Sequence, residues 1–125
     1  MEKCTCSGSG ETRIVLACAG GSNVGQISNE VARRLDTAGA ATFACLAGIS
    51  GGIDGITASV KGAGKVLVVD GCPMACAKKT MDAAGISGYR YAVVTDAGIK
   101  KVHSFQVEET DIVKAVAICL EKLQG

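Results

Sequence analysis

Residues 65–76 read KVLVVDGCPMAC and hold the clearest strand signal in the chain, followed at once by an Asp-Gly-Cys turn. Lys65 to Asp70 is a short run of Val and Leu, typical of a strand that is buried on both faces of a parallel sheet. Because Pro73 suits the first turn of a helix, we expect a helix that runs from Pro73 through Met81 to Gly85. The stretch therefore predicts a strand, a turn with two cysteines, and a helix.

The same alternation continues on both sides of this unit. Upstream we expect a strand over Ile14 to Ala19 and then a helix that is capped by Ser22, runs to Ala38 and stops at Gly39. A second strand is expected over Thr42 to Leu46. A loop over Gly48 to Gly55 and a helix from Asp54 to about Lys61 follow it. Downstream we expect a strand over Tyr89 to Thr95 and a last helix capped by Thr110, whose apolar stripe is Ile112, Val116, Cys119, Leu120 and Leu123. Strands alternating with helices predict an α/β protein, a small three-layer fold with a mostly parallel four-stranded sheet and helices on both faces.

The length of 125 residues suits one domain. Residues 1–12 are polar, contain Ser and Gly and show no apolar period, so we expect a flexible N-terminal tail that carries a CxC pair at Cys4 and Cys6. Residues 13–125 are then a single α/β domain.

Composition argues against several classes of partner. Lys and Arg number 13 against 12 Asp and Glu, and only two Tyr and two Phe are present, so neither a basic field nor a stacking platform favours nucleic acid. The N-terminus lacks the apolar stretch of a secretory signal, and no apolar run is long enough to cross a bilayer. We therefore expect a cytoplasmic protein with no nucleic-acid or membrane partner, and the sequence does not identify a protein partner.

Seven cysteines are the most informative residues in this composition, and they stand at positions 4, 6, 18, 45, 72, 76 and 119. In a reducing compartment an odd number of cysteines indicates metal ligands, redox thiols or core residues before it indicates disulfides. Cys119 lies on the apolar stripe of the last helix, so we interpret it as a core residue.

Three cysteines fall at or near the carboxyl ends of three different predicted strands, where open α/β sheets bind their ligands. These are Cys18 after the first strand, Cys45 within the second, and Cys72 just past the third. Cys76 is one helical turn beyond Cys72, so both sulfurs are expected to face the same point. We therefore predict a metal site formed by Cys18, Cys45, Cys72 and Cys76.

Four thiolates are a soft, tetrahedral ligand set, which makes zinc the first choice of ion and iron or an iron–sulfur cluster the second. Lys78 and Lys79 are expected to offset the negative charge of such a site. Asp70 either orients a site residue or caps the next helix. His103, the sole histidine, is interpreted as an exposed polar residue outside the site.

A thiol redox protein is the alternative, with Cys72 and Cys76, or Cys18, as the working sulfurs. Chemistry of the phosphatase type is disfavoured because it needs Arg six residues after the cysteine, where this chain has Val24 after Cys18 and Lys78 after Cys72. A closed four-cysteine shell leaves no open position for substrate, so a non-catalytic role is favoured over an enzyme.

The runs VVDGCPMACAKK, CAGGSNVGQISNEVARRL and CLAGISGG together resemble the bacterial and archaeal family that is named for its Asp-Gly-Cys motif and described as zinc-binding. The resemblance covers essentially the whole chain after the tail. It implies a cysteine-based metal site on Cys18, Cys45, Cys72 and Cys76, with Asp70 and Gly71 completing the motif. Some relatives carry a further cysteine where this chain has Gly20 and Gly21, and Cys4 or Cys6 is then the substitute.

Overall fold

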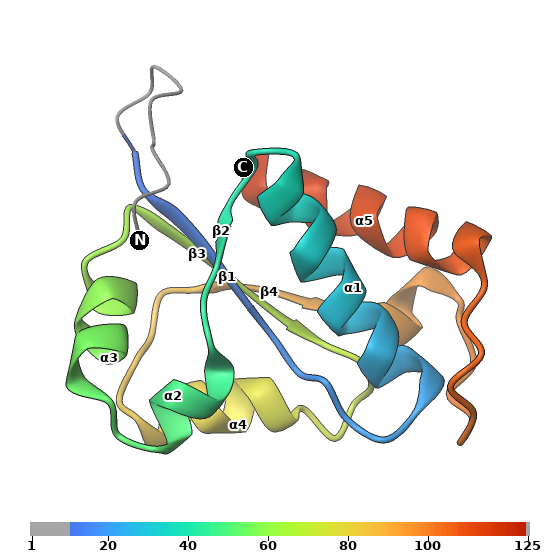
Figure 1. The fold of residues 1–125 in the computed structure, drawn as a ribbon, viewed down its shortest axis with the longest axis horizontal. Helices are drawn as coiled ribbons and strands as arrows, with labels where there is room; N and C mark the ends of the chain where they lie inside the picture. Colours follow the sequence, from blue (N-terminus) through green and yellow to red (C-terminus); the bar gives the residue numbers. More distant parts are fainter. Residues whose placement is uncertain (1–10, 125) are drawn as a thin grey trace.

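The computed structural model describes residues 11–124, which form a four-stranded parallel sheet with the strand order β2-β1-β3-β4 (Figure 1). The elements in chain order are β1 (Arg13–Ala17), α1 (Asn23–Thr37), β2 (Thr42–Phe43), α2 (Leu46–Ser50), α3 (Asp54–Lys61), β3 (Lys65–Asp70), α4 (Cys76–Ala83), β4 (Arg90–Val93), the 3-10 helix η1 (Val94–Ala97) and α5 (Glu109–Gln124). The predicted α/β class is confirmed, and every pairing in the sheet is parallel.

Helices cover both faces of the sheet because alternate strand residues point to opposite sides. Val15 and Val69 pack under α1 and α5, whereas Leu16 and Val68 pack under α2, α3 and α4, as the two groups of helices in Figure 1 indicate. The three-layer arrangement is therefore the one predicted from the run of buried strands.

The second strand is shorter than predicted, and a helix that the sequence did not reveal follows it. β2 ends at Phe43, so Cys45 lies just past the strand and precedes the first residue of α2. The predicted loop over Gly48 to Gly55 is wrong in its first part, where α2 forms and buries Ile49 in the core layer of α4. Tertiary burial decides the conformation of this short, Ala-rich stretch.

The helix that we expected to begin at Pro73 begins at Cys76 instead. A tight turn precedes it, in which the Ala75 N–H donates to the Cys72 carbonyl at 3.1 Å and Ala75 takes a left-handed φ of 57°. Cys72 and Cys76 are therefore not one helical turn apart, and the geometric reason for expecting their sulfurs to converge is wrong. The helix also ends earlier than predicted, at Ala83 rather than Gly85.

The last helix begins at Glu109, so Thr110 lies inside it and is not its cap. Its buried residues are Ile112, Ala115, Cys119 and Leu123. Cys119 is 2% exposed, which confirms it as a core residue, and burial raises the pKa of its thiol to about 12. Leu120, predicted to be in the buried stripe, is 37% exposed.

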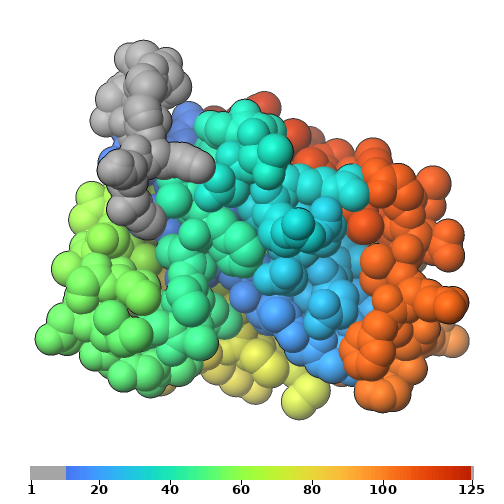
Figure 2. All heavy atoms as spheres, in the orientation of Figure 1, coloured from blue at the N-terminus to red at the C-terminus, as the bar shows by residue number. Residues whose placement is uncertain are grey.

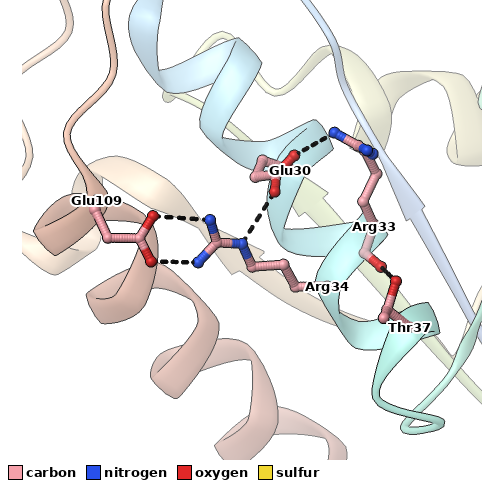
Figure 3. A network of polar contacts seen from close by, with 5 residues as sticks. All are labelled: Glu30, Arg33, Arg34, Thr37 and Glu109. Atoms are coloured by element: carbon pink, nitrogen blue, oxygen red, sulfur yellow. Dashed lines mark hydrogen bonds and ion pairs between the residues drawn. The ribbon is translucent and has the colours of Figure 1, made fainter.

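A bidentate ion pair fixes α5 against α1 (Figure 3). Arg34 on α1 donates from its two terminal nitrogens to the Glu109 carboxylate at 2.7 and 2.8 Å, and its Nε donates to Glu30 at 3.0 Å. These hydrogen bonds, first of all the one to Glu109, raise the pKa of Arg34 above its usual value. The pair orients the first turn of α5.

The amino edge of the sheet begins earlier than the predicted domain boundary. The Thr12 carbonyl accepts hydrogen bonds from the N–H groups of Gly64 and Lys65, and Glu11 forms an ion pair with Arg13 at 3.2 Å. Residues 11 and 12, which we assigned to the tail, therefore belong to the folded part. Cys4 and Cys6 lie outside the described residues.

Candidate metal and thiol site

Three thiols line the carboxyl edge of the sheet in the order of its strands. Cys45 follows β2, Cys18 follows β1 and Cys72 lies two residues beyond β3. The Cys18 N–H donates to the Val69 carbonyl at 3.0 Å, which extends the β1–β3 pairing by one residue. All five cysteines within residues 11–124 are free of disulfides.

These thiols lie at the same edge of the sheet, but they do not all lie on the same side of it. Cys18 packs in the core layer beneath α4, whereas Cys72 packs in the layer of α1 and α5, on the other side of the sheet. Cys76 is exposed as the first residue of α4, and Cys45 is exposed beside a hollow of about 350 Å³ that Phe43 also lines. No group of three or more His, Cys, Asp or Glu is arranged as a metal site in residues 11–124.

Asp70 caps α4, which is one of the two roles that the sequence left open. Its carboxylate is 1% exposed and accepts hydrogen bonds from the N–H groups of Ala77 at 2.7 Å and Lys78 at 3.0 Å. The Tyr91 hydroxyl donates a third bond to it at 2.7 Å. Burial and this hydrogen bond raise the pKa of Tyr91 above its usual value. Asp70 thus binds the helix end that carries Cys76.

Gly71 allows the chain after β3 to touch α1. A Cβ atom built on Gly71 would lie 2.7 Å from the Gly25 nitrogen and 2.7 Å from the carbonyl carbon and oxygen of Val24, all of them backbone atoms. Figure 2 shows the yellow segment that follows β3 lying against the blue start of α1. Only glycine fits here, so the second residue of the Asp-Gly-Cys turn serves packing.

Cys72 has a cationic neighbour that the sequence did not indicate. The Lys101 ammonium donates to the Cys72 sulfur at 3.4 Å. Lys78, which we expected to offset the charge of the site, instead lies 3.5 Å from the Asp82 carboxylate, and its ammonium is about 6 Å from the ring centres of Tyr89 and Tyr91. The charge beside Cys72 therefore comes from the segment before α5.

Asn23 holds that segment in place from the start of α1. Its side-chain amide donates to the Lys100 carbonyl at 2.9 Å, and its side-chain oxygen accepts the Val102 N–H at 2.8 Å. His103 is exposed, as predicted, and its Nδ1 lies 3.0 Å from the Gly21 carbonyl oxygen. Segment 100–103 thus contacts Cys72, the start of α1 and the loop after β1.

Sequence reasoning missed Asn23 and Lys101 because neither stands in a pattern. Lys101 is 29 residues from Cys72 and belongs to a stretch with no helical or strand period. The Lys100–Lys101 pair beside the only histidine was the one available signal, and it carries no information about which thiol it meets.

The parallel sheet with helices on both faces, and the cysteines at its carboxyl edge, together define a small doubly wound α/β protein with free thiols at the carboxyl ends of its strands. Residues 14–119 match the DGC domain, so the chain belongs to the DGC domain family. It is similar to the anaerobic and virulence modulator AnvM of Pseudomonas aeruginosa, with 32% identity over 98 residues, which cover 78% of this chain and 75% of that protein. No solved structure matches the chain significantly. The helices of residues 11–124 include none that is long and apolar enough to cross a membrane.

Proposed function

We propose that this protein binds a soft metal ion, with zinc as the first choice and iron or an iron–sulfur cluster as the second, and that it has a regulatory rather than an enzymatic role. The observation that carries the proposal is the placement of Cys45, Cys18 and Cys72 behind three adjacent strands. Thiolates are the ligands that zinc and iron–sulfur clusters prefer. The name of AnvM, a modulator, supports a regulatory role by analogy.

The donor chemistry fits zinc, but the described arrangement is not a closed shell. Cys18 and Cys72 lie on opposite sides of the sheet, so a single ion bound by both requires a shift of the turn after β3 or of the loop after β1. Of these two cysteines, Cys72 is the one more easily moved, because it lies in a turn beyond the hydrogen-bonded part of β3 and is partly exposed. Segment 100–103, which contacts Cys72, would move with it.

A thiol redox role is the second candidate, and Cys72 is the sulfur that favours it, because it is free of a disulfide, partly exposed and placed in the turn before α4. A reaction partner with a disulfide could reach it there and exchange with it. The two candidates differ in what purified, reduced protein contains: the first requires a bound ion and the second does not.

Cys72→Ser should release most of the metal from protein purified without added metal, because it removes a sulfur of the Asp-Gly-Cys turn that the proposed site uses. Elemental analysis before and after the substitution measures this. Cys119→Ser is the matched control, since it removes a buried thiol far from the edge and should reduce stability but retain metal. Absence of metal from the reduced wild-type protein contradicts the proposal, and a Cys72→Ser variant that retains the wild-type metal content contradicts the assignment of Cys72 as a ligand.

Deleting residues 1–10 tests whether Cys4 and Cys6 complete the shell. Glu11 lies at the amino edge, seven residues before Cys18, and an extended stretch of that length spans ~23 Å. From Cys4 to Glu11 an extended chain spans up to ~25 Å, which is enough to reach the carboxyl edge. We therefore expect the deletion to change the rate of metal loss to a chelator without unfolding the domain. Equal rates for both proteins would mean that the tail takes no part.

A further inference from the structure

Helix α5 carries a second apolar stripe that the rest of residues 11–124 leaves partly exposed. Val113 is 53% exposed and Leu120 is 37% exposed, and Ala117 is exposed between them. Spacings of four and three residues place all three on one side of the helix. The buried residues of α5 form a different face, so these side chains contribute little to the core.

The charges beside this stripe are opposite in sign and arranged at the two ends. Lys114 and Glu121 are two helical turns apart, on the same flank of the stripe, and both are exposed. Neither forms an ion pair or side-chain hydrogen bond anywhere in the described part of the chain, in contrast to Glu109, which is bound to Arg34. The flank is therefore available to a partner.

We infer that α5 is a homodimer interface, in which α5 of one copy packs antiparallel on α5 of a second copy. A two-fold axis near the middle of the stripe, between Ala117 and Leu120, brings Lys114 of each helix to Glu121 of the other. The charge pattern is thus complementary to itself in the antiparallel orientation, whereas a parallel two-fold pair would place this flank of the two helices on opposite sides of the dimer and leave the charges apart. The buried residues of α5, Ile112, Ala115, Cys119 and Leu123, hold the helix against the core and so keep the stripe turned outward for this contact.

The partner is a second copy of this chain because the complementary charges, Lys114 and Glu121, both lie on α5. The stripe is short, and its ion pairs are exposed, so the dimer is expected to be reversible and to weaken with added salt. This inference is independent of metal binding, since α5 holds none of the thiols at the carboxyl edge.

Sedimentation velocity over a wide range of protein concentrations tests the inference. We expect the wild-type chain to form dimers as concentration rises, and Lys114→Glu to raise the dimer dissociation constant by about tenfold, because it turns both ion pairs into repulsions. The charge swap Lys114→Glu with Glu121→Lys should restore wild-type dimerisation, and Leu120→Ser should weaken it.

Lys122→Glu is the matched control, since it makes the same charge change on the side of α5 turned away from the stripe, and it should dimerise like the wild type. All these residues are exposed, so circular dichroism should report unchanged folding in every variant. A wild-type chain that stays monomeric at the highest concentration overturns the inference. So does a charge swap that fails to recover the dimer, or a Lys122→Glu variant as weak as Lys114→Glu.

Discussion

Gly71→Ala should destabilise the folded protein by about 3 kcal/mol or more, because the added methyl group has no space. Its position would be 2.7 Å from three backbone atoms of Val24 and Gly25. A flexible side chain could turn away from such a clash, but the backbone of α1 cannot move without disturbing the core beneath it. The loss should appear as a lower urea midpoint in equilibrium unfolding.

Gly55→Ala is the control for this substitution. Apart from its chain neighbours and the backbone of its own helix, no atom of residues 11–124 lies within 4 Å of a Cβ built on Gly55, and the residue belongs to helix α3. Alanine is preferred to glycine in a helix, so this change should stabilise the protein by about 0.5–1 kcal/mol. Equal midpoints for Gly71→Ala and the wild type would show that the approach of the two segments is not as close as described.

Asp70→Ala should cost about 2–4 kcal/mol, because it leaves three donors without their acceptor. The backbone N–H groups of Ala77 and Lys78 and the Tyr91 hydroxyl all bind this one carboxylate. Asp70→Asn keeps one acceptor oxygen and should cost less. Hydrogen exchange should increase most at the start of α4, where the cap is lost.

Asp54→Ala provides the comparison, since Asp54 also stands at a helix start but is exposed and is the first residue of α3. Its loss should change stability by about 0.5 kcal/mol or less. If the two aspartates have similar effects on stability, the Asp70 carboxylate does not cap a buried helix end. The difference between the two changes in the free energy of unfolding measures how much the buried position of Asp70 adds to its effect on stability.

The three residues of the Asp-Gly-Cys turn have different roles in this structure. Asp70 binds the start of α4, Gly71 permits contact with α1, and Cys72 alone presents a reactive group near the surface. The first two hold the third at the carboxyl edge beside Lys101. Substitutions at Asp70 and Gly71 are therefore expected to act on stability first, and substitution at Cys72 on metal or redox chemistry.

Several parts of the fold could be predicted from local sequence because local physics decides them. The apolar run of β3 predicts a buried strand, and Ser22 predicts the start of α1, where its hydroxyl accepts the Gly25 N–H at 3.1 Å. Boundaries set by distant partners were missed. The start of α4 depends on the Asp70 carboxylate more than on Pro73, and α2 forms because Ile49 finds a buried place.

The sequence by itself determined the α/β class, the carboxyl edge as the place of Cys18 and Cys72, and the burial of Cys119, since hydrophobic period and strand order suffice for these. Only the tertiary structure decided which way each thiol points and which charge it meets. Cys18 and Cys72 diverge because adjacent parts of the edge face different layers, and Lys101 reaches Cys72 because Asn23, at the start of α1, binds Lys100 and Val102 on either side of it. Such contacts join residues far apart in the chain, and no local pattern encodes them.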